Sequence, residues 1–159
     1  FTPHQLAEYS FTNQGVIIGD ARLTGAIDLL DINKKTREVI VTDYKTGRGV
    51  GSWNGRTDYE KIKLHKYRQQ LMMYKLLVEG SRDFGGPHIV THGVIDFVEP
   101  DGEGISQQLV MTFDGEELAE FKQLIQIVWQ HIMNLNLPDT SKYSPNYQGM
   151  LAFERDLLK

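Results

Sequence analysis

The segment Glu38–Gly47, with the sequence EVIVTDYKTG, constrains the fold more than any other part of the chain. Its β-branched residues are typical of a strand, and the glycine at its end is typical of the loop that follows. Side chains of a strand alternate between two faces, so Asp43 and Lys45 project from one face and Tyr44 from the other. A carboxylate and an ammonium group therefore converge on one site, with the Tyr44 carbonyl beside it.

A second extended run, Ala21–Ile32, precedes this strand and contains Asp28. The polar stretch Asn33–Thr36 between the two runs has the composition of a hairpin turn, which predicts that they are antiparallel neighbours. Facing residues of such neighbours have β-carbons roughly 5 Å apart. Asp28 then reaches the face of Asp43 if the register places the two side by side.

Two aspartates and a carbonyl match the preferences of a hard divalent cation. Magnesium takes carboxylate, carbonyl and water oxygens, and it commonly uses only one or two carboxylates. We expect Asp28, Asp43 and the Tyr44 carbonyl to bind Mg²⁺ or Mn²⁺, and Lys45 to orient the nucleophile or stabilise the transition state. The alternative is a surface ion pair between Asp43 and Lys45, which the short motif alone does not exclude.

A helix is predicted after the next loop. One stripe of it carries two tyrosines, a glutamine and several aliphatic residues: Leu64, Tyr67, Gln70, Leu71, Tyr74, Leu77 and Val78. Gln70 is a polar residue beside this apolar stripe, and a hydrogen bond to backbone at a sheet edge is the alternative to a role in the site. For Tyr74, core packing and substrate contact are equally open.

The motifs GAID, DYKTG and QLMMY follow one another in the order found in the RecB-like branch of the PD-(D/E)xK nuclease superfamily, which the chain resembles. The resemblance implies that Asp28 and Asp43 are metal ligands, that Lys45 is the catalytic lysine and that Gln70 lies beside the catalytic centre. It also implies that Tyr74 supports the helix or contacts nucleic acid. The implied activity is metal-dependent hydrolysis of DNA phosphodiester bonds, in DNA repair or recombination.

The same resemblance implies an α/β (α+β) fold with a restriction-endonuclease-like core, in which a central mixed five-stranded sheet is flanked by helices. Length and composition predict one domain over residues 1–159. RecB-like modules are often fused to superfamily 1 helicases of the UvrD/Rep or RecB/AddA type. We therefore expect a C-terminal fragment of a larger helicase–nuclease, covalently linked to helicase domains and lacking its first helix.

In that family, a helix with a further acidic or histidine ligand normally precedes the first strand. The segment Phe1–Asn13 is too short to supply this helix. Its candidates for the upstream ligand are His4 and Glu8, of which Glu8 is the better placed. If the missing helix carries a ligand, the isolated chain is expected to bind metal poorly and to show little activity.

Basic residues near the site are candidates for nucleic-acid contacts. We expect Arg48, Lys63 and Lys66 to neutralise phosphates, and Trp53 in the glycine-rich loop 46–58 to stack on a base. The chain has a formal net charge of −4, so such a footprint is local. A solvated helix face for the lysines and a tryptophan folded back on the domain are the open alternatives.

Further strands are expected at Gly15–Ala21, His88–Val98 and Ser106–Phe113, with a hairpin turn at 100–104. Asp114 then begins a long helix. One side of this helix is apolar: Leu118, Phe121, Ile125, Val128 and Ile132. We interpret that side as core and not as a partner site.

Composition excludes several other functions. The chain has no cysteine, so an iron–sulfur cluster, known in several RecB-like nucleases, cannot form, and a cytoplasmic location is expected. No apolar run is long enough to cross a bilayer, and no leader is recognisable, so no membrane partner is expected. The remaining alternative is a catalytically silent nucleic-acid-binding or scaffolding module of the same fold, although the three charges at the site favour an enzyme.

Overall fold

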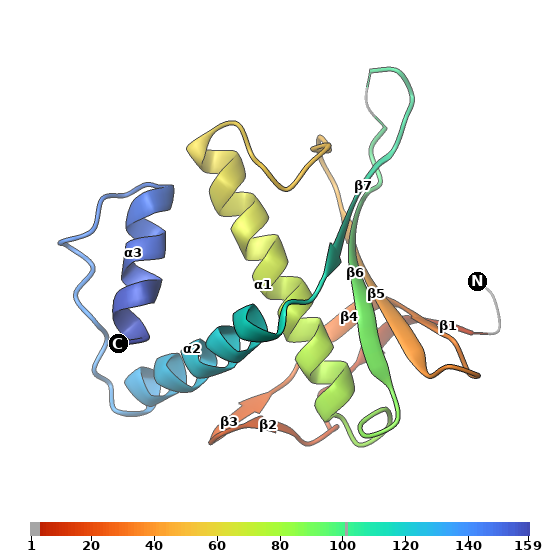
Figure 1. The fold of residues 1–159 in the computed structure, drawn as a ribbon, viewed down its shortest axis with the longest axis horizontal. Helices are drawn as coiled ribbons and strands as arrows, with labels where there is room; N and C mark the ends of the chain where they lie inside the picture. Colours follow the sequence, from red (N-terminus) through yellow and green to blue (C-terminus); the bar gives the residue numbers. More distant parts are fainter. Residues whose placement is uncertain (1–3, 101) are drawn as a thin grey trace.

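The computed structural model describes residues 4–100 and 102–159, and its centre is a mixed five-stranded sheet (Figure 1). The strands follow the order β1 (Gln5–Ser10), β4 (Ala26–Ile32), β5 (Glu38–Lys45), β6 (Ile89–Phe97) and β7 (Gln107–Thr112). Strands β5 and β6 are parallel, and the other neighbours are antiparallel. This sheet and its flanking helices confirm the predicted fold class.

The prediction of the first strand at Gly15–Ala21 was wrong. That region forms a separate hairpin of β2 (Val16–Ile18) and β3 (Ala21–Leu23), because the chain turns back at Gly19, whose φ is 58°. Such a left-handed conformation suits glycine. The first strand of the main sheet is instead β1, which pairs with β4 at the sheet edge. The predicted hairpin turn at 100–104 includes Asp101, which lies outside the described residues.

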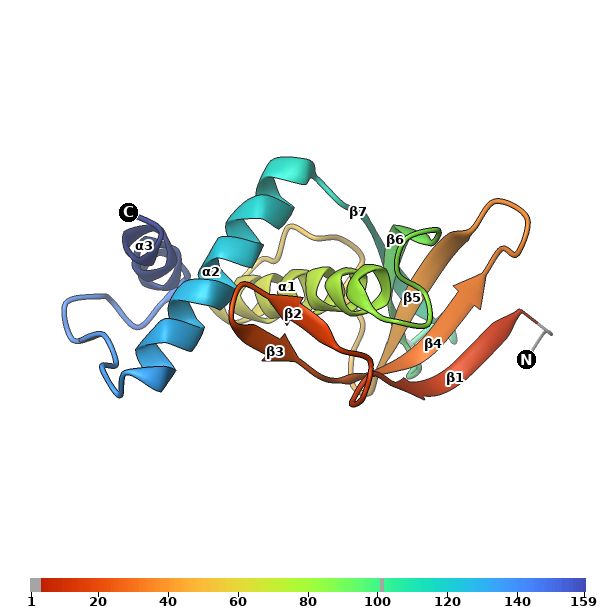
Figure 2. The ribbon, with the colours of Figure 1, turned by 90° about the horizontal axis from the view of Figure 1, so that it is seen from below.

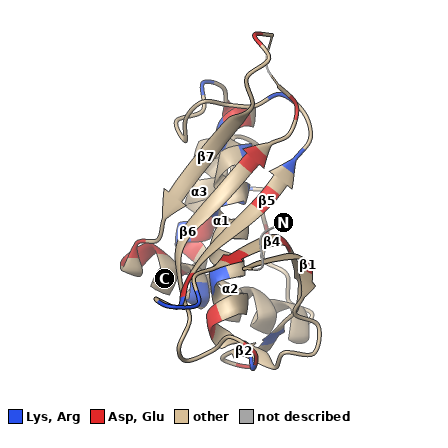
Figure 3. Cartoon of the chain, turned by 90° about the vertical axis from the view of Figure 1, so that its right-hand side faces the viewer, with Lys and Arg blue, Asp and Glu red and all other residues tan. Residues whose placement is uncertain are grey.

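Helix α1 (Asp58–Gly80) covers one face of the sheet, and the opposite face is turned to the viewer in Figure 3. Its start is capped because the Thr57 hydroxyl accepts a hydrogen bond from the Glu60 N–H. The helix sits close to β6, since a β-carbon at Gly93 would lie 2.9 Å from Leu71 Cδ1. Leu71 is fully buried at this contact.

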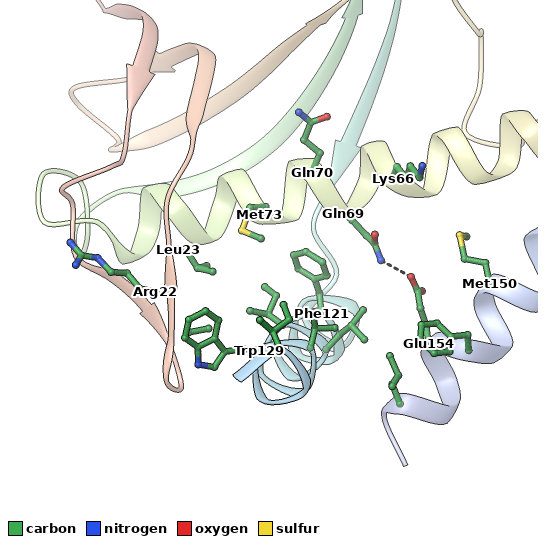
Figure 4. A pocket seen from close by; sticks show the side chains of 17 residues that line it. Arg22, Leu23, Lys66, Gln69, Gln70, Met73, Phe121, Trp129, Met150 and Glu154 are labelled. Atoms are coloured by element: carbon green, nitrogen blue, oxygen red, sulfur yellow. Dashed lines mark hydrogen bonds between the residues drawn. The ribbon is translucent and has the colours of Figure 1, made fainter. Parts of the chain in front are cut away.

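The prediction that the apolar side of the next helix is core holds for part of that side. Leu118, Phe121 and Ile125 are partly buried and pack against the core. Helix α2 (Gly115–Met133) begins after its Asp114 cap as predicted, but none of its residues is buried. Val128 and Ile132 are 41% and 49% exposed. From Phe121 onward the apolar side also lines an open cleft of about 780 Å³ between α1, α2, α3 and the β2–β3 hairpin (Figure 4).

Helix α3 (Tyr147–Leu157) was not predicted, and it is fastened to α1 by polar contacts. His65 Nε2 lies 2.9 Å from a carboxylate oxygen of Glu154, and the Gln69 amide donates to the same carboxylate. Burial alone would raise the pKa of Glu154, but the hydrogen bonds from His65 and Gln69 and the charge of His65 hold it below its usual value.

Figure 2 shows the β2–β3 hairpin beside α1 and α2, and both helices contact it. A β-carbon at Gly19 would lie 2.9 Å from the Gln126 side chain, so the hairpin turn approaches α2 closely. In the described ranges 4–100 and 102–159, no helix has the length and apolarity that crossing a bilayer requires.

Truncating Leu71 tests the contact between α1 and the sheet. We expect Leu71→Ala to lower the free energy of unfolding by about 2–5 kcal/mol, because the buried cavity cannot fully collapse. Urea unfolding followed by circular dichroism measures this loss. Leu137→Ala, at a position 73% exposed, is the matched control and should stay within about 0.5 kcal/mol of the wild type. Equal stability of the two variants would contradict the contact.

Candidate active site

The end of β5 carries the two charged groups that its alternation predicts on one face. The Asp43 side chain is only 4% exposed, and Lys45 Nζ lies 2.7 Å from its Oδ2 atom. A carboxylate at this depth is costly unless partners compensate its charge. The alternative of a surface ion pair therefore does not describe this site, because the pair is on the inner face beneath α1.

Helix α1 supplies two further partners for the same carboxylate. The Tyr74 hydroxyl and the Gln70 amide nitrogen each donate a hydrogen bond of 2.7 Å to Asp43 Oδ1. The Gln70 amide oxygen accepts a bond of 2.9 Å from Lys45 Nζ. Gln70 thus bonds to both Asp43 and Lys45. Its side chain does not make the hydrogen bond to backbone at a sheet edge that was the alternative.

Tyr74 belongs to the interior of the site. Its side chain is buried, with 7% exposure, and its hydroxyl also accepts a hydrogen bond from Gln70. Burial, followed by the hydrogen bond and charge of Asp43, raises the pKa of Tyr74, so the hydroxyl stays protonated as a donor. In this structure the ring is covered and the hydroxyl holds Asp43, and a contact of Tyr74 with nucleic acid stays a prediction.

Asp28 reaches the site from β4. The register pairs Leu29 with Thr42, so Asp28 and Asp43 are the next residues on the two strands. An Asp28 carboxylate oxygen accepts a hydrogen bond of 2.8 Å from the Tyr44 N–H. The Tyr44 side chain is 41% exposed, so only its main chain borders the site.

A comparison with protein-family models finds one that matches residues 1–147 and is described as the PD-(D/E)XK nuclease superfamily. The chain belongs to the PD-(D/E)XK nuclease superfamily. A search among curated proteins gives no match. The superfamily assignment explains why a carboxylate and a lysine two residues apart occupy the end of a central strand, and it makes nuclease activity the expected chemistry of the site.

The donor set at this PD-(D/E)XK site fits a divalent cation. Asp43 Oδ2 is buried and has no aligned hydrogen bond, although the Lys45 ammonium is nearby, so it retains a lone pair for a metal. Asp28 and the Tyr44 carbonyl are the neighbouring oxygen donors. Within the described part of the chain, no three carboxylate or imidazole groups form a metal cluster. Two carboxylates completed by water are sufficient for magnesium.

The upstream candidate Glu8 lies on β1, between the pairs Ala7–Leu29 and Tyr9–Ile27, and thus at the level of Asp28. Its φ of 50° is left-handed, and its side chain is exposed. Glu8 therefore sits on the strand next to the site without joining a cluster of ligands.

The predicted nucleic-acid residues of this PD-(D/E)XK domain fall in separate places. Arg48 and Lys63 line one cleft beside the loop after β5. Lys66 lies one turn before Gln70 on α1 and borders the apolar cleft, which Gln70 also lines (Figure 4). The Trp53 indole donates a 2.9 Å hydrogen bond to the Val110 carbonyl, and Arg68 lies over its ring. Trp53 is thus folded back on β7, as the alternative interpretation described, and its role in base stacking stays a prediction.

Tyr67 is a site residue that the sequence did not single out. Lys45 Nζ lies 4.9 Å from the centre of its ring. Burial, and then the charge of Asp43, raise the pKa of its hydroxyl. The sequence feature that could have indicated this role is the position of Tyr67 on the α1 stripe, one turn before Gln70. Both residues therefore approach Lys45.

Removing one hydroxyl tests how Asp43 is held. We expect Tyr74→Phe to lower the free energy of unfolding by about 1.5–3 kcal/mol, because a buried hydrogen bond to a charged group is lost. Chemical denaturation measures the difference. Tyr59→Phe loses the same atom on the same helix at a position 74% exposed, and its stability should match that of the wild type. A Tyr74→Phe protein as stable as this control would refute the assigned role.

Proposed function

We propose that the chain is the nuclease domain of a metal-dependent enzyme that hydrolyses phosphodiester bonds in DNA. The observation that carries this proposal is the buried Asp43 carboxylate, which shares one pocket with Lys45 and Gln70 and keeps one oxygen without an aligned hydrogen bond. A domain without catalysis gains nothing from this arrangement, since an apolar replacement would be less costly to bury. A silent nucleic-acid-binding or scaffolding module is therefore the less favoured function.

The roles follow from the contacts. Asp28, Asp43 and the Tyr44 carbonyl would hold Mg²⁺ or Mn²⁺, and the ion would neutralise phosphate charge and lower the pKa of a bound water. Lys45 is placed to orient the nucleophile or to stabilise charge on the reacting phosphate. Gln70 keeps Lys45 and Asp43 in register by bonding to both. Tyr74 holds Asp43 from the interior.

The finer assignment rests on the motifs GAID, DYKTG and QLMMY, which support a RecB-like nuclease. Such a domain would act in DNA repair or recombination, linked to helicase domains. Arg48 and Lys63 are the proposed phosphate contacts in the cleft beside the exit of β5, and Lys66 contributes from a position one turn before Gln70 on α1.

Substitutions of the two β5 charges separate metal binding from chemistry. In the full-length protein, we expect Asp43→Asn to abolish calorimetric uptake of Mg²⁺ and DNA cleavage together, because a ligand charge is lost. Lys45→Ala should retain metal uptake but lose at least about a hundredfold in cleavage rate, the size of effect seen when one transition-state donor is removed. Gel analysis of labelled DNA with magnesium or manganese measures the rates.

The control for these variants is Asp96→Asn. Asp96 lies opposite Tyr44 in the sheet, and its carboxylate accepts a hydrogen bond from Gln108 outside the site. Cleavage by this variant should equal that of the wild type. Undiminished cleavage by Asp43→Asn would refute the proposed mechanism. Metal uptake that is unchanged by substitution of Asp28 and of Asp43 would favour the silent module.

A further inference from the structure

A second cleft, of about 720 Å³, opens beside the exit of β5. It lies between the loop that follows β5, the first turns of α1 and the start of β7. Three cationic side chains line it, Arg48, Arg56 and Lys63, against the single carboxylate of Glu60. The ring of Tyr59 borders the same space and is 74% exposed. Positive charge and an open aromatic face are thus combined in one cavity.

This cleft is connected to the catalytic centre by one stripe of α1. Tyr59, Lys63 and Tyr67 follow one another at four-residue intervals, and Gln70 comes next, so all four lie on the same side of the helix. The helical rise of 1.5 Å per residue separates Tyr59 from Gln70 by about 16 Å. Aromatic and cationic side chains therefore alternate from the cleft to the residue that bonds to Asp43.

Contacts of Lys63 and Tyr67 show that the middle of the stripe faces the end of the sheet. The Lys45 ammonium lies 4.9 Å from the centre of the Tyr67 ring. The Lys63 ammonium lies 5.9 Å from the centre of the Phe97 ring, and Phe97 is the partner of Lys45 in the parallel β5–β6 pairing. The row thus reaches the lysine assigned to catalysis without a break.

We propose that this cleft is a subsite for single-stranded nucleic acid and holds the nucleotides next to the scissile phosphate. The proposal rests on the proposed nuclease function and adds a substrate class to it. Arg48, Arg56 and Lys63 neutralise phosphates, and the exposed Tyr59 ring stacks on a base. An unpaired strand is required, because a base face is free for stacking only when the base has left a duplex.

The apolar cleft in Figure 4 does not offer this chemistry. Its walls are mainly aliphatic and aromatic side chains of α2 and α3, and its cations are Arg22 and Lys66. Its acidic member, Glu154, is bonded to Gln69 and His65. A phosphate chain following this cleft would meet apolar surface in place of cations.

Binding of labelled oligothymidylate to the full-length protein tests the subsite. Fluorescence anisotropy is measured in EDTA, so that no cleavage occurs. Tyr59→Ala should weaken binding by roughly tenfold through the loss of one stacking contact. Arg56→Gln should reduce the slope of log affinity against log salt by about 0.7, the contribution of one phosphate contact on a single strand.

Lys34→Gln is the matched control for charge, because Lys34 is exposed in the β4–β5 turn and lines neither cleft. Its affinity and salt slope should equal those of the wild type. Both test residues are exposed, so unchanged melting curves are expected and confirm that the variants are folded.

The outcomes distinguish the subsite from the nuclease function. If Tyr59→Ala and Arg56→Gln bind the oligonucleotide as the wild type does, the subsite is refuted, whatever the cleavage assay gives. If a blunt duplex binds as tightly and depends equally on Tyr59, the single-strand assignment is overturned. If binding depends on both residues but the wild type does not cleave DNA with either magnesium or manganese, the subsite stands and the nuclease function fails.

Discussion

The buried carboxylate of Asp43 is the constraint on which the rest of the structure depends. A charge at this depth must be surrounded by donors, and these come from two elements: Lys45 from β5, and Gln70 and Tyr74 from α1. The helix is thereby fixed on the sheet at the strand end that carries the candidate active site. Shifting α1 along β5 would leave an unpaired charge in the interior, so the packing of the domain and the geometry of the site are stabilised by the same contacts.

Local periodicity was sufficient to predict most of the site. The two-residue repeat of a strand placed Asp43 and Lys45 on one face, and the four-residue spacing of Gln70 and Tyr74 placed them one above the other on a helix. The partner of Tyr74 was not predictable, because it depends on how closely α1 approaches β6. That distance is set by the contact of Leu71 with Gly93, which are far apart in the sequence.

The fold was predictable where strands and helices have strong patterns of their own, as in β4 to β7 and α1. Strand β1 was missed because an edge strand with the sequence QLAEYS lacks alternation, and its pairing with β4 decides its conformation. The apolar side of α2 was predicted to be core, and this holds for Leu118, Phe121 and Ile125 but not for the exposed Val128 and Ile132. Amphipathicity shows that a helix has an apolar side, and only the tertiary arrangement shows whether anything covers it.

The length of α1 has a consequence for how any ligand meets this domain. One continuous helix, from Asp58 to Gly80, carries both Tyr59 and Gln70. Tyr59 lines the second cleft, and Gln70 bonds to the Asp43 carboxylate. Movement of the glycine-rich loop cannot alter the separation between them. In the proposed nuclease, a nucleic acid bound at Tyr59 would therefore be cut at a fixed distance from that contact, and the length of the helix would set this distance.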